Sequence, residues 1–372
     1  MIAVVGGVAV ETALAVPRLP GVGETVVGGP AARRPGGQGL RQALAAARLA
    51  VGSTGGLGGV RVAILGRVGA DPDGELARSA LAEEDVDVAW LMGSVDVMTG
   101  QRITLHPDGE SAGGQAAAVS PGANAELSAE DCAAAGALLR DAEVTLLQHG
   151  GAGDRFGAGA RGALADPGAP GVPDEAAAAA ARLAGGTVLL IPGPVGEVPA
   201  DLLAMVDVLV PDRDGLAAVV GAAPEDLPDL HAVADAARSL RGPASVVVRL
   251  GPEGALVVED GAVLLIPPPA AMPSATLAGT PTATPGTAAG AEAGAGAGAG
   301  AGAVDAGGRW GALAGDAFCA GLAVAVAERE PLHEAARFAC AAGALVAHGG
   351  VRGLSALPTR EEVERITSRG SA

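Results

Sequence analysis

One carboxylate in the sequence stands where an anion could be bound and a proton removed. Residues 312–326 read A-L-A-G-D-A-F-C-A-G-L-A-V-A-V, so Asp316 lies where small residues lead into an apolar helical pattern. The start of a helix presents unpaired N–H groups and a partial positive charge, and Ala314 and Gly315 leave that end open to an anion. Asp316 can be a helix cap, which is the commoner role, or a base beside a transferring phosphoryl group.

Two further stretches carry groups that suit ligand binding. Glu11 follows the apolar run of residues 2–10, which predicts a buried strand, and open α/β sheets bind ligands at the carboxyl ends of their strands. Gly36, Gly37 and Gly39 form a turn before a strong helical pattern, and glycine lets the backbone approach a ligand closely. A plain loop before a helix explains these glycines equally well.

The composition excludes several classes of function. The chain of 372 residues has a net charge of −18 and no basic stripe, which argues against nucleic acid or an anionic membrane as a partner. It contains no lysine, so Schiff-base and P-loop lysine chemistry are excluded. The three cysteines show no metal-binding spacing and are expected as buried thiols in a reducing cytoplasm. No apolar run approaches the roughly 20 residues of a membrane span, and no signal peptide is expected.

Strand and helix patterns alternate along most of the chain and predict a doubly wound α/β sheet. After the first strand, further strands are predicted at residues 61–67, 86–91, 101–105, 144–147, 187–191, 206–210, 245–250, 255–259 and 262–266. Residues 21–31 have the pattern of a short exposed strand pair. Residues 267–303 are rich in Pro, Thr and Ala and then alternate Gly with Ala, so they have too few large side chains to offset the entropy of ordering. We expect a disordered insertion there.

The order of these motifs resembles the ribokinase, or PfkB, family of carbohydrate kinases. The resemblance rests on the acid after the first strand, G-G-Q-G at 36–39, P-G-A-N-A-E-L-S at 121–128, L-G-P-E-G at 250–254 and A-G-D-A-F-C-A-G-L at 314–322. It covers nearly the whole chain except the insertion. The family implies one ribokinase-like domain, in which helices flank a mostly parallel central sheet. It also implies a small β-sheet lid, here from about 12–34 and 99–117, which closes over the sugar and can mediate homodimers.

The resemblance implies roles for individual residues. Asp316 matches the base that takes the proton from the sugar hydroxyl, and the backbone of Ala314 and Gly315 matches the anion hole for the phosphoryl group. Glu11 and the glycines of the G-G-Q-G turn match the sugar site. The positions that match the nucleotide site are Asp212, Leu250, Gly251, Glu253, Gly254 and Gly315. The implied cofactors are ATP, Mg²⁺ and a monovalent cation such as K⁺.

Several positions depart from the family's pattern. They are Ala9 and Glu11 for N-x-D, Gln38 and Arg41 for a Lys and an Asn, Gly150 for a mid-chain acid, Asp212 to Gly215 for N-x-x-E, Asp305 and Ala306 for a displaced D-T pair, and Leu313 for a small residue. Asp212 and Asp214 suit Mg²⁺ held through water, although Asp212 serves equally well as a helix cap. Asp305 matches the monovalent-cation segment. His149 is the histidine expected near the sugar.

Two functional hypotheses follow from these matches and departures. The first is an ATP-dependent kinase for ribose or a related sugar, because Asp316 and its anion hole are retained. The altered sugar motifs leave the substrate open, and a nucleoside fits the same family. The second is a catalytically impaired family member that binds a nucleotide or metabolite as a sensor, because the sugar, N-x-x-E and D-T motifs are eroded.

Overall fold

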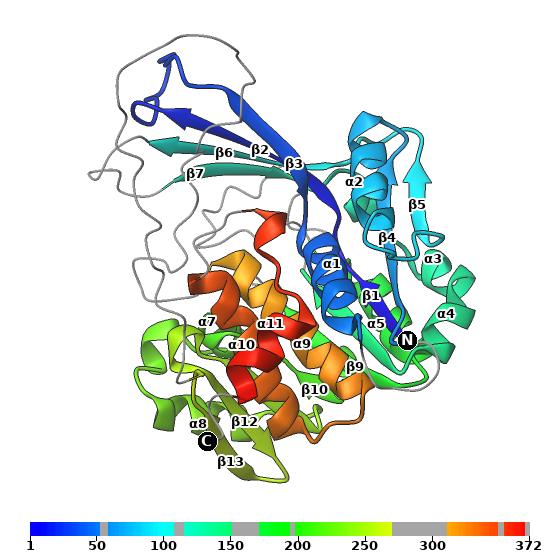
Figure 1. Ribbon diagram of the computed structural model, residues 1–372, viewed down its shortest axis with the longest axis vertical. Coiled ribbons are helices and arrows are strands. Elements are labelled where there is room, and N and C mark those ends of the chain that lie inside the picture. The colour runs from blue at the N-terminus through cyan, green and yellow to red at the C-terminus, as the bar shows by residue number, and fades with distance from the viewer. Residues whose placement is uncertain are drawn as a thin grey trace.

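A large, mostly parallel sheet runs through the centre of the molecule (Figure 1). The computed structural model describes residues 1–52, 59–107, 115–150, 171–193, 198–269, 311–348 and 353–368. Within these ranges, the sheet has nine strands in the order β13 (Ala262–Ile266), β12 (Ala255–Glu259), β11 (Ser245–Arg249), β10 (Val208–Leu209), β9 (Thr187–Pro192), β8 (Val144–His149), β1 (Ile2–Val5), β4 (Val62–Gly69) and β5 (Leu91–Ser94). From β11 to β5 all neighbours are parallel, whereas β12 and β13 are antiparallel additions at one edge.

Helices cover both faces of this sheet, as the alternating pattern predicted. Successive strand residues point to opposite faces, so Ile2 and Val4 of β1 enter one apolar cluster while Ala3 and Val5 enter the other. The first cluster includes residues of α1 (Gln38–Ala50), α2 (Pro72–Ala82), α9 (Ala312–Ala327), α10 (Leu332–His348) and α11 (Arg360–Ser368). The second includes residues of α3 (Ala129–Ala134), α4 (Gly136–Asp141), α5 (Asp174–Leu183), α6 (Ala200–Leu203), α7 (Arg213–Val220) and α8 (Leu230–Ser239). The doubly wound fold is therefore confirmed.

Small side chains bring the helices of the first face into close contact. The residues of α9 from Ala314 to Ala325 are all buried, and α9 packs against both α1 and α10. A Cβ atom added to Gly321 would lie 3.2 Å from the Cα of Ala339 on α10, which is tighter than an ordinary contact. With so few aromatic residues in the chain, this core gains its contacts from the close approach of backbones.

A smaller sheet projects from the central body and corresponds to the predicted lid (Figure 1). Its strands, in spatial order, are β3 (Ala31–Gly36), β2 (Ala9–Val16), β6 (Gly100–Pro107) and β7 (Ala116–Ser120). Strands β2 and β6 are parallel, and the outer pairs are antiparallel. We use the word lid for these four strands.

The structure corrects three boundaries near the lid and the first strand. The predicted strand 2–10 ends at Val5, and the chain then crosses through Gly6 to Val8 into β2. Glu11 therefore lies within a lid strand and not at the end of a central strand. Residues 21–31 do not form the predicted strand pair, because the segments on either side of them, β2 and β3, pair with each other. The predicted strand 86–91 is displaced, since β5 begins at Leu91.

Some predictions fall on residues that the structure does not describe. Asp305 and residues 270–303 of the predicted insertion lie outside the described ranges, as does part of the predicted lid at 108–114. In the ranges that are described, none of the helices combines the length and the apolar character needed to cross a bilayer.

Candidate active site

The crossing from β1 to β2 is held by two buried amide side chains from distant parts of the chain. The carbonyl oxygen of Gln148 accepts a hydrogen bond from the Gly7 N–H at 2.9 Å. Asn124 accepts from the Val8 N–H at 2.7 Å and donates to the Val8 carbonyl at 2.7 Å. These bonds satisfy backbone groups that lie between two strands and would otherwise be buried without partners. They fix the direction in which β2, and Glu11 with it, leaves the body.

The glycines of the G-G-Q-G turn are explained by packing against the same crossing. Gly37 has a φ of 90°, in the region that favours glycine, and a Cβ atom there would lie 2.6 Å from the Gly7 carbonyl oxygen. A Cβ atom at Gly39 would lie 2.5 Å from the Gly6 carbonyl carbon, and one at Gly36 would lie 2.6 Å from Cγ of Glu11. The turn therefore seats α1 directly on the β1–β2 crossing beside Glu11.

A buried guanidinium joins the two carboxylates that the sequence singled out. Arg41 of α1 donates from Nε to Asp316 Oδ2 at 2.6 Å and from Nη1 to Glu11 Oε1 at 2.5 Å. The side chains of Arg41, Glu11 and Asp316 are 7%, 15% and 3% exposed. Gln42 donates from Nε2 to the other oxygen of Asp316 at 3.0 Å. We call Glu11, Arg41, Gln42 and Asp316 the carboxylate–arginine cluster; it links the lid, α1 and α9.

The pKa values of the two carboxylates of this cluster are shifted in opposite directions. Burial raises the pKa of Asp316 above its usual value, and the nearby Arg41, Gln42 and Arg249 offset this only in part. Burial also acts to raise the pKa of Glu11, but the guanidiniums of Arg41, Arg34 and Arg102 outweigh it and hold that pKa below its usual value. Glu11 is therefore the more firmly ionised of the two, and Asp316 is the better proton acceptor.

The first turn of α9 differs from the expectation in two respects. Its N-cap residue is Gly311, and Asp316 is the fifth residue of the helix, with its oxygens bonded to Arg41 and Gln42. The helix-cap interpretation of Asp316 is therefore wrong. In addition, the N–H groups of Ala314 and Gly315, which we expected to be open, donate to the Gly311 carbonyl at 3.0 and 3.2 Å. Any anion that approaches this turn must share these donors with Gly311.

A second arginine supplies positive charge at the same turn. The side chain of Arg249, at the end of β11, is 14% exposed, and its Nη1 would lie 2.6 Å from a Cβ atom added to Gly315. Its Nη2 lies 3.4 Å from Asp212 Oδ2, at the start of α7. The guanidinium and the positive end of α9 together provide positive charge at this turn, next to the carboxylate of Asp212. This turn is therefore suited to an anionic group.

The predicted nucleotide segment forms a tight turn next to Arg249. Leu250 donates its N–H to the Gly254 carbonyl at 2.9 Å, which closes the turn between β11 and β12. Gly251 and Gly254 have φ angles of 61° and 97°, and a Cβ atom at Gly254 would lie 2.0 Å from the Ile266 carbonyl oxygen. Glu253 points outward and pairs with Arg213 at 3.6 Å. The structure thus brings this turn, Arg249 and the start of α9 together.

The predicted metal ligands are only partly assembled. Asp212 caps α7, accepting from the Gly215 N–H at 2.7 Å, and its side chain is half exposed. Asp214 lies in the first turn of the same helix. Within the described ranges, no group of three or more His, Cys, Asp or Glu side chains could hold a metal ion. This arrangement fits a cation such as Mg²⁺, which keeps most of its water and is held by one or two carboxylates together with the phosphates of a nucleotide.

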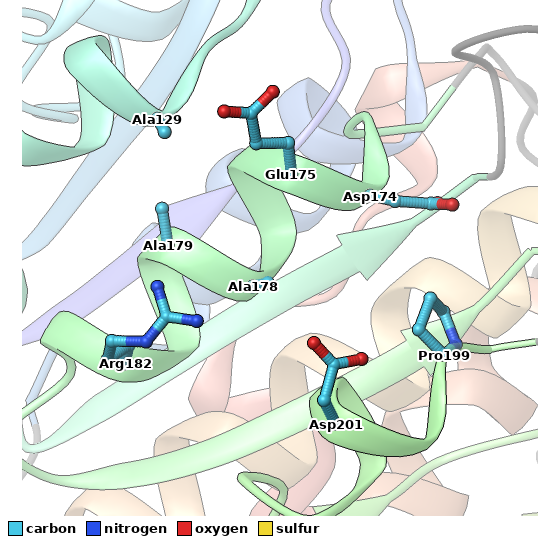
Figure 2. A pocket seen from close by; sticks show the side chains of 8 residues that line it. All are labelled: Ala129, Asp174, Glu175, Ala178, Ala179, Arg182, Pro199 and Asp201. Carbon is cyan, nitrogen blue, oxygen red and sulfur yellow. The ribbon is translucent and has the colours of Figure 1, made fainter.

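His149 has a partner outside the carboxylate–arginine cluster. Its ring is buried, and Nε2 lies 2.8 Å from Oδ1 of Asp174 at the start of α5. Asp174 also borders a surface pocket of about 360 Å³ (Figure 2). The residues that line it are Ala129, Asp174, Glu175, Ala178, Ala179, Arg182, Pro199 and Asp201, none of which was predicted as a site residue. Figure 2 shows Asp174 and Glu175 pointing in different directions, so their carboxylates do not converge on one ligand.

Sequence reasoning missed three residues that the structure places at the site. Arg41 was noted only as a departure from a motif, Gln42 was not noted, and Arg249 was read as part of a strand. Among the described residues, Gln42 Oε1 is buried without a hydrogen-bond partner. A polar residue in an apolar helix or strand was the available signal, but the signal does not say which distant group is the partner.

Comparison with known proteins identifies the family. The model for pfkB family carbohydrate kinases matches residues 1–277 and 313–359, and the gap between these ranges overlaps the predicted insertion. Ribokinase of Haemophilus influenzae is 26% identical to this chain over 363 residues, which cover 96% of this chain and 95% of that protein.

Solved structures of related kinases share the fold. The structure of ribokinase from Thermotoga maritima is similar with a TM-score of 0.71 at 22% identity, covering 99% of each chain. Ribokinase of Arabidopsis thaliana, whose structure contains ribose and ATP, is similar with a TM-score of 0.70 at 23% identity, covering 98% of this chain and 97% of that one. Since the family model matches most of its length, this chain belongs to the pfkB family of carbohydrate kinases.

Proposed function

We propose that this protein transfers the terminal phosphoryl group of ATP to a hydroxyl group of a sugar, with Asp316 as the general base. The observation that carries the proposal is the position of Asp316: a buried carboxylate with a raised pKa, on the helix whose first turn lies against the Arg249 guanidinium. Base and positive charge are thus held side by side, as phosphoryl transfer requires. Family membership supports the same reaction class.

In the proposed reaction, Asp316 accepts the proton of the acceptor hydroxyl. The hydroxyl oxygen bonds to the terminal phosphorus as the bond to the leaving oxygen of ADP breaks. Negative charge on the phosphoryl oxygens is stabilised by Arg249 and by the N–H groups of Ala314 and Gly315. The nucleotide lies along the turn from Leu250 to Gly254. In these roles the protein mainly positions groups and neutralises charge, and catalysis of phosphoryl transfer depends on both.

The remaining residues of the proposed site bind the cations and the sugar. Asp212 and Asp214 hold Mg²⁺ through water, and the ion neutralises charge on the phosphates when it is bound. The segment around Asp305 serves the monovalent cation. Glu11 contacts the sugar from the lid, together with the G-G-Q-G turn, and the lid mediates a homodimer.

ATP consumption tests the proposal directly. The full-length protein is incubated with ATP and Mg²⁺ and a panel of pentoses, hexoses, sugar acids, sugar phosphates and nucleosides, and ADP formation is followed. We expect turnover that depends on one member of the panel and a phosphorylated product confirmed by mass spectrometry. ADP release at the same rate with and without every acceptor would contradict the proposal.

Replacing Arg249 with glutamine should lower kcat by about 10²–10³, the cost of losing one preorganised donor to a developing anion. KM for the acceptor should change little, because Arg249 lies at the phosphoryl end of the site. Arg67→Gln is a control, since Arg67 is likewise mostly buried and pairs with carboxylates, those of Asp131 and Glu126, away from the site. Equal losses in the two variants would show that Arg249 acts only on stability.

One observation favours a second candidate function, a family member that binds a nucleotide or metabolite and turns it over poorly. Both oxygens of Asp316 already accept hydrogen bonds, from Arg41 and from Gln42. A carboxylate held in this way is less available to a hydroxyl proton. ATP binding measured by calorimetry, without ADP formation across the panel, would support this sensor function over the kinase.

A further inference from the structure

A buried carboxylate outside the carboxylate–arginine cluster joins two strands of the lid. Asp73 lies in the first turn of α2, and its side chain is 5% exposed. Its Oδ1 accepts a hydrogen bond from Nη2 of Arg33 in β3, and its Oδ2 accepts from Nε2 of Gln101 in β6 at 3.1 Å. Because β2 lies between β3 and β6, this one carboxylate spans the strand to which Glu11 belongs.

These bonds lie on the face of the lid opposite to the side chain of Glu11. Gln101 is paired with Val10, the residue before Glu11, and Arg33 is paired with the residue after it. Successive residues of a strand point to opposite faces, so α2 holds the flanks of β2 from one side while Arg41 of α1 bonds Glu11 from the other. The side of Val10 is covered, since this residue is 1% exposed and α2 packs against β2 and β3 where the lid meets the central body (Figure 1).

A second aspartate of the same turn fixes the start of β6. Asp71 is the N-cap residue of α2, and its carboxylate accepts from the N–H and the hydroxyl group of Thr99, the residue before β6, at 2.7 and 2.8 Å. It also accepts from the Gly74 N–H at 2.8 Å, which caps the helix. The start of α2 therefore holds β6 at two points, and Asp73 extends this hold across β2 to β3.

The two partners in the bond between α2 and β3 differ in their access to water. The side chain of Arg33 is 54% exposed, so its guanidinium can turn to solvent when it loses its partner. The carboxylate of Asp73 has no such route, and a buried charge without partners is costly. Replacing Asp73 therefore releases the lid from α2 without leaving an unpaired charge in the interior.

We propose that Asp73 is a positioning residue for the acceptor: by holding β3 and β6 it fixes Glu11 of β2 at the separation from Asp316 that the acceptor requires. Arg41 links Glu11 to Asp316 on the other face of the lid, so the two contacts set this separation from opposite sides. Asp73 acts through the lid and touches no substrate. The inference rests on the proposed function, in which Glu11 contacts the sugar and the nucleotide lies elsewhere.

Steady-state kinetics of Asp73→Ala test this role. ADP formation by the full-length protein is followed with the member of the acceptor panel that supports turnover, at varied acceptor and at varied ATP. KM for the acceptor should rise by about threefold to tenfold, the effect of one net hydrogen bond on a binding equilibrium, whereas kcat and KM for ATP should change little. Asp73→Asn should give a smaller rise, because its amide oxygen still accepts from Gln101 while the charge that faces Arg33 is gone.

Glu75→Ala is the matched control for the loss of a charge from this helix turn. Glu75 is the other acidic residue in the first turn of α2, but it is exposed. Negative charge there favours the helix in both residues, so an effect on α2 alone would be common to the two variants. Melting temperatures confirm that the variants fold. An equal rise of acceptor KM in Asp73→Ala and Glu75→Ala, or a fall in kcat as large as the rise in KM, would refute the positioning role.

Hydrogen–deuterium exchange separates this inference from the proposed function, because it needs no turnover. In Asp73→Ala, the amides of β2, β3 and β6 should exchange at least about tenfold faster than in the unmodified protein, since a lid released from α2 opens more often. The amides of β1 and β8 in the central sheet should not change. If no acceptor supports ADP formation, the phosphotransfer proposal fails, and this measurement still decides whether Asp73 holds the lid. Unchanged exchange in the lid strands would overturn the inference.

Discussion

Asparagine in place of Asp316 should lower kcat for phosphoryl transfer by about 10²–10⁴, the usual contribution of a general base. The substitution keeps the shape of the side chain and an oxygen that can accept from Gln42, but it removes the group that takes the proton. The measurement is ADP formation at saturating acceptor and ATP, with ATP affinity determined separately. A kcat within a few-fold of the original would show that Asp316 has only a structural role in holding Arg41.

The pH dependence of the unmodified enzyme gives an independent check on this base. A base must be deprotonated to act, so the rate should fall as pH decreases through the pKa of Asp316. Because burial raises that pKa, the fall should lie above the usual range of an aspartate, which is about 3.9. Glu11 cannot cause this fall in rate, since its pKa is held below the usual value and it stays ionised over that pH range. If the rate of Asp316→Asn falls over the same pH range, another group is responsible for the fall.

Methionine in place of Arg41 should destabilise the protein by about 3–5 kcal/mol, because two buried carboxylates would lose their common cation. Methionine has a similar length and fills much of the space, so the loss of stability comes mainly from the removed charge. Urea denaturation at pH 7 measures it. Arg34→Met is the matched control: Arg34 pairs with the same Glu11 but its side chain is 47% exposed, and surface pairs contribute less than about 1 kcal/mol.

The sign of the pH effect on stability follows from Glu11. Its pKa is lowered in the folded protein, so it contributes stability that is present above its unfolded pKa and is lost as pH falls through the folded pKa. Without Arg41, both carboxylates can relieve their burial by binding protons. The stability difference between Arg41→Met and the unmodified protein should therefore shrink on acidification. A difference that is small at pH 7, or independent of pH, would contradict the ion-pair role of Arg41.

The sequence predicted the fold well because its signal is local and repeated. Short apolar strands separated by amphipathic helices leave few topologies, and the order of the motifs selected one of them. The boundary at Glu11 was missed for a physical reason. Residues 2–10 are almost uniformly apolar, so nothing local distinguishes a central strand from the crossing that follows it. What separates them in the structure is hydrogen bonding by Asn124 and Gln148, which are more than a hundred residues away.

The sequence pointed to the candidate site only where a single residue carries the proposed chemistry. Asp316 was singled out because a carboxylate follows small residues at a predicted helix start, and the order of the other motifs favoured a base over the commoner helix cap. Its bond to Arg41 spans 275 residues, and the approach of Arg249 to Gly315 joins a strand end to a helix start. Such pairs depend on how helices and strands pack, not on spacing along the chain. The sequence also did not show that the N–H groups of Ala314 and Gly315 donate to Gly311. This depends on where the helix begins, and its N-cap residue is Gly311.

The carboxylate–arginine cluster also sets the order in which the protein can become active during folding. The pair of Glu11 and Arg41 closes a loop of 30 residues, whereas Arg41 and Asp316 are separated by 275, so the second contact costs more chain entropy to form. Until α9 docks beside α1, Arg41 lacks its bond to Asp316, and Asp316 lacks the bonds from Arg41 and Gln42. Refolding should therefore restore helical circular dichroism before it restores phosphotransfer. The return of enzyme activity would then report on the docking of α9 beside α1.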